Sequence, residues 1–151
     1  MLRTLLIALS LAVGPYNAAA SDEQVQSAKL IWPAWQCSTL AVHAGRKDEV
    51  ARLFNAGFSS ALTVIQAAFG GTLSKDAIEV LPIGISWNLW GPSPEFSAGY
   101  VFAVIESETK TLIEDRAERQ EDELLAEYTN RRRVVAEMMF DEANCDLISQ
   151  R

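Results

Sequence analysis

The pattern of hydrophobic and polar positions along this chain predicts helices. The clearest covers residues 48–69, where apolar or small side chains recur at helical spacing over several turns. Gly57 is among the small residues, and we expect another helix to approach closely there. The pattern occupies positions 50, 53, 54, 57, 58, 61, 62, 65, 68 and 69.

The positions of proline, glycine and serine predict two further helices. Pro33 suits a first helical turn and Gly45 suits the position after a last one, which predicts a helix over residues 33–44. Ser74 suits an N-cap, so a short extra helix is expected after it. The segment 81–96 contains three prolines and two glycines and is expected to be irregular. Ser93, Pro94 and Glu95 suit the N-cap and the first two positions of the helix that follows.

No glycine or proline occurs from Tyr100 to Arg151. One helix over residues 94–144 would be about 75 Å long, which is too long for a compact domain of this size. We therefore expect a break at 114–123, where eight of ten residues are charged. A protruding helix used for dimerisation is the alternative. The side chains expected to face the core are Ala98, Val101, Phe102, Ile105 and Leu112, then Leu124, Leu125, Tyr128, Val135, Met138 and Met139.

These elements predict an all-α fold. No strand-like alternation extends beyond a few residues. The expected architecture is a four-helix, bundle-like single domain with one short extra helix.

The first residues have the pattern of a secretory signal peptide. Arg3 precedes a short apolar run, and Ala18 and Ala20 supply the small residues that cleavage needs. We predict a signal peptide at residues 1–20 and a single exported domain at 21–151, located in the periplasm or outside the cell. Residues 21–31 are expected to form a mobile leader. No apolar run reaches the roughly 20 residues that span a bilayer, so membrane insertion is not expected.

Export changes the interpretation of the two cysteines. In an oxidising compartment, Cys37 and Cys145 are expected to form one disulfide, which closes a loop of about 108 residues. A redox-active pair would need the Cys-x-x-Cys spacing, which is absent. A zinc site needs about four ligands, and the chain has only one histidine besides these cysteines.

The charge balance excludes one class of partner. The chain has 13 basic and 20 acidic residues, and its net charge of −7 repels nucleic acid. The run Arg131–Arg133 is interpreted as a solvated helix face, with an ion pair between Glu127 and Arg131. A docking patch for an acidic partner is the alternative.

The sequence contains no motif that identifies a catalytic residue. His43 is the only histidine, and no motif pairs it with a nucleophile. Ser107 and Lys110 match a Ser-x-x-Lys pattern without its companion motifs. Haem ligation by His43 with Met138 or Met139 lacks an attachment motif. No catalytic, cofactor-binding or metal residue is therefore predicted.

Tryptophans are the most suggestive residues. Trp32, Trp35, Trp87 and Trp90 all lie in or beside segments expected to be irregular. They either fill the core beneath loops or leave one or two rings accessible to anchor a partner. We expect binding through residues 83–96, with Trp87, Trp90 and Phe96 as the contact residues.

The sequence thus favours an exported, non-catalytic binding or interaction protein of a bacterial-type cell envelope. It would dock a protein partner through residues 83–96, which we call the aromatic loop. The alternatives are an acidic periplasmic chaperone or stress protein, and a small-molecule-binding protein or enzyme of unfamiliar type.

Overall fold

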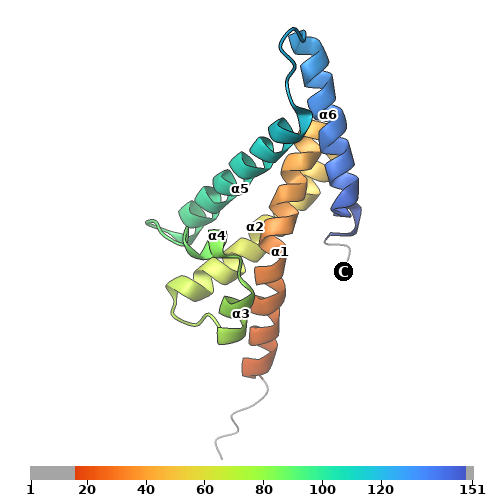
Figure 1. The fold of residues 1–151 in the computed structure, drawn as a ribbon. Coiled ribbons are helices and arrows are strands. Elements are labelled where there is room, and N and C mark those ends of the chain that lie inside the picture. The colour runs from red at the N-terminus through yellow and green to blue at the C-terminus, as the bar shows by residue number, and fades with distance from the viewer. Residues whose placement is uncertain (1–15, 149–151) are drawn as a thin grey trace, which may run out of the picture.

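The computed structural model describes residues 16–148, and every regular element in this range is helical (Figure 1). The four long helices are α1 (Tyr16–Ala44), α2 (Lys47–Phe69), α5 (Pro94–Ala117) and α6 (Leu125–Glu142). The short elements are α3 (Lys75–Val80), α4 (Ile83–Ser86) and a 3-10 turn, η1 (Cys145–Leu147). The predicted all-α, four-helix architecture is confirmed, with α4 as an unpredicted turn in the segment expected to be irregular.

The first helix differs from the prediction, because α1 continues through Pro33 instead of beginning there. The polar segment 21–31, expected to be a mobile leader, is part of this helix. Proline inside a helix costs about 3 kcal/mol through a lost hydrogen bond and a clash. Ile31 and Trp35 flank Pro33 and are fully buried. Burying two such side chains stabilises by about 3–6 kcal/mol, which offsets that cost.

The predicted signal peptide at residues 1–20 lies mostly outside the described residues. Export therefore stays a prediction.

After a turn at Gly45, whose φ is 82°, α2 packs back against α1. The close approach predicted at Gly57 is present. A Cβ atom added there would lie 2.5 Å from Cδ1 of Trp35. The indole Nε1 of Trp35 donates a hydrogen bond of 3.2 Å to the carbonyl of Phe54. The interface between α1 and α2 is therefore built around one buried indole ring.

Buried side chains form two separate clusters along α1. The first lies where α1 meets α2, α3 and α5, with α4 beside them. The second lies where α1 meets the start of α2, the end of α5, α6 and η1. Large members of the first are Ile31, Trp35, Ile65, Ile85 and Ile105. Large members of the second are Leu40, Leu53, Ile113, Met139 and Phe140.

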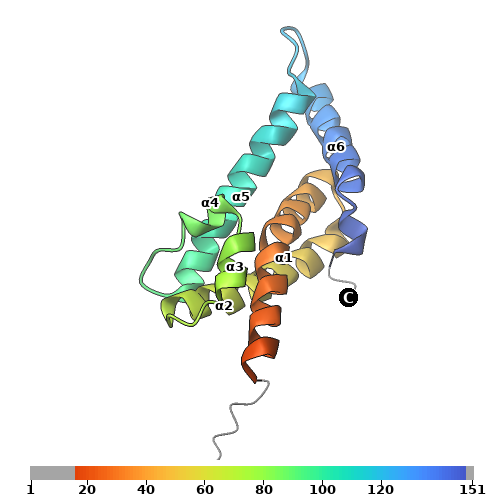
Figure 2. The same ribbon diagram turned by 60° about the horizontal axis from the view of Figure 1, so that its bottom comes forward.

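Helices α5 and α6 are separate, as expected, and form a hairpin whose tip projects beyond the end of α1 (Figures 1 and 2). The connection covers residues 118–124, slightly later than the predicted break. Four side chains expected to face the core are exposed instead: Leu112, Leu124, Leu125 and Met138. Leu124 and Leu125 lie at the hairpin tip, which other elements do not cover. Helical spacing identifies an apolar stripe but does not show how much of it a neighbour covers.

Ion pairs across the hairpin differ from the predicted one. Arg131 pairs with Glu123 and donates a hydrogen bond of 3.2 Å to the carbonyl of Glu118. The expected pair between Glu127 and Arg131 is absent from the described ion pairs. Arg132 pairs with Glu114 of α5, with 3.2 Å between nitrogen and oxygen. The basic run thus ties α6 to the end of α5 and the connection after it.

The predicted disulfide between Cys37 and Cys145 is confirmed. The two Cα atoms are 5.6 Å apart, and both side chains are buried. Since α1 begins earlier than expected, Cys37 lies in its second half, not at its start. The bridge therefore fastens η1 to the second cluster.

Arg46, in the turn before α2, forms ion pairs with α6 at the same end of the molecule as the disulfide. Its Nη2 lies 2.7 Å from a carboxylate oxygen of Glu137 and 2.7 Å from one of Asp141. Its guanidinium carbon lies 4.3 Å from the centre of the Phe140 ring. The hydrogen bond from Arg46 holds the pKa of Glu137 below its ordinary value of 4.5. The folded state therefore favours the charged carboxylate.

We expect Glu137→Gln to reduce the acid sensitivity of folding. A carboxyl whose pKa is lower in the folded than in the unfolded state stabilises the fold at pH values above the unfolded-state pKa. This contribution is lost as the pH falls through the folded-state pKa. The loss occurs below about pH 4.5. Urea midpoints measured from neutral pH downwards should therefore decline less steeply in Glu137→Gln than in wild type.

Glu108→Gln is the matched control, because it removes a charge from an exposed position in α5. Parallel acid profiles for the wild type and Glu137→Gln would contradict the assigned role of the Arg46–Glu137 pair.

Candidate functional site

The segment between α3 and α5 is shaped by local hydrogen bonds. The side-chain amide of Asn88 donates to the carbonyl of Gly84 at 2.6 Å. The hydroxyl of Ser97, in α5, donates to the carbonyl of Asn88 at 3.4 Å. Ser93 caps α5 by accepting a hydrogen bond of 3.2 Å from the backbone N–H of Phe96, and Pro94 begins the helix, both as predicted. The segment is therefore held to the rest of the fold.

Aromatic side chains of this segment are exposed. The exposed fractions are 77% for Trp87, 52% for Trp90, 47% for Phe96 and 37% for Tyr100. The ring centre of Trp90 lies 6.0 Å from that of Phe96 and 4.9 Å from that of Tyr100. We call these four residues the aromatic surface.

The structure separates the four tryptophans into two pairs. Trp35 is fully buried, and Trp32 is half-buried, with its ring close to Gly84. Trp87 and Trp90 are accessible to solvent. Of the two readings of the sequence, core filling thus describes the first pair and accessibility the second.

Tyr100 was not among the residues selected from the sequence. It lies one helical turn after Phe96 in α5, and this i, i+4 spacing is the signal that would have identified it. The structure brings Trp90, Phe96 and Tyr100 together. Trp87 lies three residues before Trp90, at the end of α4.

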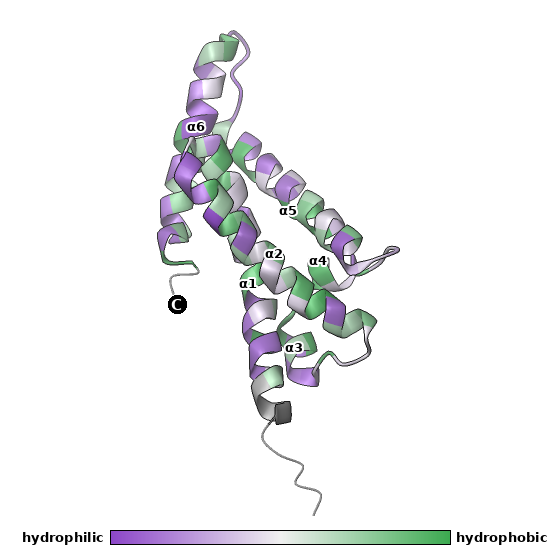
Figure 3. Ribbon diagram, turned by 180° about the vertical axis from the view of Figure 1, so that it is seen from behind, coloured by the Kyte–Doolittle hydropathy of each residue, from purple (hydrophilic) through white to green (hydrophobic). Residues whose placement is uncertain are grey.

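Charged groups are sparse around the aromatic surface. Glu95 is the one charged residue between Glu79 and Glu106, and no lysine or arginine occurs between Lys75 and Lys110. In Figure 3 the ribbon of α4 is hydrophobic, whereas the connection between α5 and α6 is hydrophilic. An uncharged aromatic face suits dry contact with apolar side chains.

Groups for acid–base or metal chemistry do not gather at this surface. His43 lies at the other end of the fold, near the end of α1, and Ser107 and Lys110 are exposed on α5. Among residues 16–148, no three His, Cys, Asp or Glu side chains come together in a way that could hold a metal ion. In the same range, no helix has the length and apolar character needed to span a bilayer.

Comparisons with known proteins give no match to a family model, a curated protein or a solved structure. The function has to be inferred from the side chains of this chain.

Proposed function

We propose that this protein is an exported, non-catalytic binding protein that docks a protein partner through the aromatic surface. The observation that carries the proposal is the exposure of Trp87 and Trp90 on a segment held by hydrogen bonds. A fully buried aromatic side chain covers about 150–250 Å², and apolar burial contributes about 25 cal/mol per Å². Closing a partner over both indoles therefore yields several kcal/mol.

Preorganisation supports the same proposal. Proline residues and the Asn88–Gly84 hydrogen bond restrict the segment before binding. A restricted segment loses less conformational entropy on association than a flexible one. Large rigid rings in such a segment are typical of the residues that dominate binding energy at protein interfaces.

Charge favours a protein over a lipid surface as the partner. Segments that bind anionic membranes combine aromatic residues with lysine or arginine. The stretch between Lys75 and Lys110 contains neither. The partner we propose therefore presents an uncharged, apolar groove.

Support for export comes from the amino-terminal signal pattern and the disulfide. A disulfide between the only two cysteines is typical of proteins in oxidising compartments. An exported binding protein would meet its partner in the envelope or outside the cell.

We expect Trp87→Ala and Trp90→Ala to fold like the wild type and to lose partner affinity. Both rings are more than half exposed, so their removal leaves little empty space in the core. Truncating a ring at the centre of an interface costs about 2 kcal/mol or more, which is about thirtyfold in Kd. Thermal melting measures folding. Cross-linking and affinity capture from an envelope fraction, followed by titration of the captured protein, measure binding.

Leu125→Ala is the matched control, because the exposed fraction of Leu125, 69%, lies between those of the two tryptophans, and Leu125 is on α6, away from the aromatic surface. Unchanged partner affinity in folded Trp87→Ala and Trp90→Ala variants would refute the proposal. Binding of the wild type to zwitterionic vesicles, lost in the same variants, would assign the surface to lipid. Capture of many unfolded proteins in place of one stoichiometric partner would favour a chaperone.

A further inference from the structure

The two halves of α6 are attached to the fold in different ways. All the buried side chains of this helix lie in its second half: Ala136, Met139 and Phe140. The side chains of the first half, residues 125–133, are exposed or half-buried. The second half is also held by the disulfide, through η1, and by the ion pairs of Arg46. Segments with few buried contacts open more readily than the core, so the first half of α6 is the part that separates first.

Polar contacts hold the first half of α6 in place. Arg131 pairs with Glu123 in the connection, and Arg132 pairs with Glu114 of α5, with 3.2 Å between nitrogen and oxygen. Ion pairs near the surface contribute little each. The attachment of this half is therefore sensitive to the gain of one further charge beside it.

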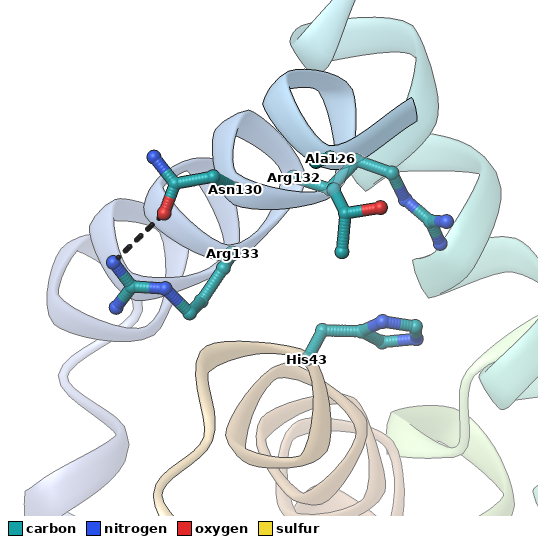
Figure 4. Close-up of a pocket in the computed structure, with 6 residues that line it drawn as sticks. His43, Ala126, Asn130, Arg132 and Arg133 are labelled. Atoms are coloured by element: carbon teal, nitrogen blue, oxygen red, sulfur yellow. Dashed lines mark hydrogen bonds between the residues drawn. The ribbon is translucent and has the colours of Figure 1, made fainter. Parts of the chain in front are cut away.

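His43, in the last turn of α1, lies below this part of α6 (Figure 4). Its ring points to the side on which the guanidinium of Arg132 lies, whereas the guanidinium of Arg133 is turned the other way, to Asn130. A depression of about 330 Å³ lies between the end of α1 and α6 at this point. None of the described hydrogen bonds or ion pairs involves the imidazole. The ring is thus half-buried without a direct partner for its charged form.

The charges that act on the imidazole come from α5 and α6, and none comes from α2. Burial first, and then the charges of Arg132 and Lys110, hold the pKa of His43 below its ordinary value of 6.5. The carboxylates of Glu106 and Glu114 act in the opposite direction and are outweighed. The folded arrangement therefore favours the neutral imidazole.

We propose that protonation of His43 releases the first half of α6, and the connection before it, from the end of α1 while the second half stays in place. The imidazolium then lies beside the guanidinium of Arg132, whose Nε is already buried without a hydrogen-bond partner. Separation returns both cations to water, which favours the open arrangement. The hairpin tip is thus part of an arm that opens in mild acid. This device does not depend on the aromatic surface or on its partner.

The pH range of the opening follows from the protonation of His43. In the open arrangement the ring is solvated, and its pKa returns to about 6.5. A histidine whose pKa is lower in the closed arrangement stabilises that arrangement above this pH. The contribution is lost as the pH falls through the closed-state pKa. The carboxyl of Glu137, whose ordinary pKa is 4.5 and is lowered in the fold, titrates in a more acidic range, so the two effects are separable.

Two NMR measurements on the full chain test the proposal. The first is a pH titration of the imidazole resonances, which report a single group because His43 is the only histidine. We expect its pKa to lie below 6.5. The second compares amide exchange at about pH 7.5 and about pH 5.5, after correction for the intrinsic effect of pH on exchange.

Opening exposes the amides of residues 128–133, because a released segment of this length does not stay helical in water. We expect their protection to fall at the lower pH, by up to about tenfold for each unit by which the measured His43 pKa lies below 6.5. The protection of residues 135–142 should stay unchanged, because the disulfide and Arg46 hold them.

Variants distinguish the titration of His43 from a general effect of acid. In His43→Gln, which has no titrating side chain at this position, protection of residues 128–133 should be the same at both pH values. Lys110→Gln removes an exposed cation that lowers the His43 pKa, and the matched Lys75→Gln removes an exposed cation from α3. We expect a raised His43 pKa and a smaller loss of protection in Lys110→Gln alone.

Three results would overturn the proposal, and each is read from the same two measurements. One is a His43 pKa at or above 6.5 in the wild type. Another is an equal loss of protection in the wild type and His43→Gln, or in Lys110→Gln and the wild type if His43→Gln does not fold. The third is an equal loss of protection along the whole of α6, which would indicate global destabilisation in place of local opening.

Discussion

Replacing both cysteines by serine is expected to lower the free energy of unfolding by about 3–5 kcal/mol. The disulfide joins residues 108 positions apart, and cross-linking so long a loop strongly restricts the unfolded chain. A domain of this size has a net stability of about 5–15 kcal/mol, so the loss is a large share. The melting temperature should fall by about 10–20 °C. Urea unfolding and calorimetry of the two proteins measure the difference.

The double replacement by alanine controls for the hydroxyl groups that serine would bury beside Phe140 and Leu40. The reduced wild type supplies a second comparison, without any substitution. If all three bridge-free proteins melt within about 2 °C of the oxidised wild type, the bridge does not stabilise the fold.

Gly57→Ala is expected to destabilise the protein by about 1–3 kcal/mol, the usual cost of overpacking. Alanine normally stabilises a helix relative to glycine by about 1 kcal/mol, so the expected sign is reversed here. The reason is the Trp35 ring, whose nearest atom would lie 2.5 Å from the new Cβ. Trp35 is fully buried and hydrogen-bonded to the carbonyl of Phe54, which limits its freedom to move away. Urea unfolding measures the change.

Gly99→Ala is the matched control. Gly99 lies in α5, and a Cβ added there meets nothing within 4 Å. This substitution should stabilise by about 0.5–1 kcal/mol. A double-mutant cycle with Trp35→Leu tests the cause, because a smaller side chain at 35 should remove part of the Gly57→Ala penalty. Equal stabilisation by Gly57→Ala and Gly99→Ala would show that the α1–α2 contact is looser than described.

Local signals in the sequence were enough to identify much of the fold. The apolar stripe of α2, the Ser74 cap of α3 and the Ser93–Pro94 start of α5 all depend on neighbours within a few residues. The disulfide followed from the cysteine count and the signal pattern. Each of these inferences needs only short-range chemistry or a simple exclusion.

The start of α1 could not be located in the same way. Pro33 is as compatible with a first turn as with a costly interior position, and only tertiary burial decides between them. Ile31 and Trp35 supply that burial through contacts with distant elements. The exposure of Leu124 and Leu125 was missed for a related reason, since α1 ends before it can cover the hairpin tip.

The candidate site could be predicted only in part from the sequence. The aromatic loop stood out by composition, but ring burial depends on whether another element reaches each ring. Trp35 lies against Gly57, whereas Trp87 lies at the end of a single-turn helix and remains exposed. The proximity of His43 and Arg132 was not predicted, because the two residues are brought together only by the return of α6 to the end of α1.

The positions of the two cysteines also determine which incorrect disulfides can form during biosynthesis. The α1–α2 pair is complete at Phe69, but Cys37 must wait as a free thiol until Cys145 has been made. With no third cysteine in the chain, an incorrect bridge within one molecule is impossible. The remaining error is a bridge between two nascent chains. Its frequency depends on the local concentration of newly made chains. Early packing of α1 against α2 reduces it, because α2 partly covers the free thiol of Cys37.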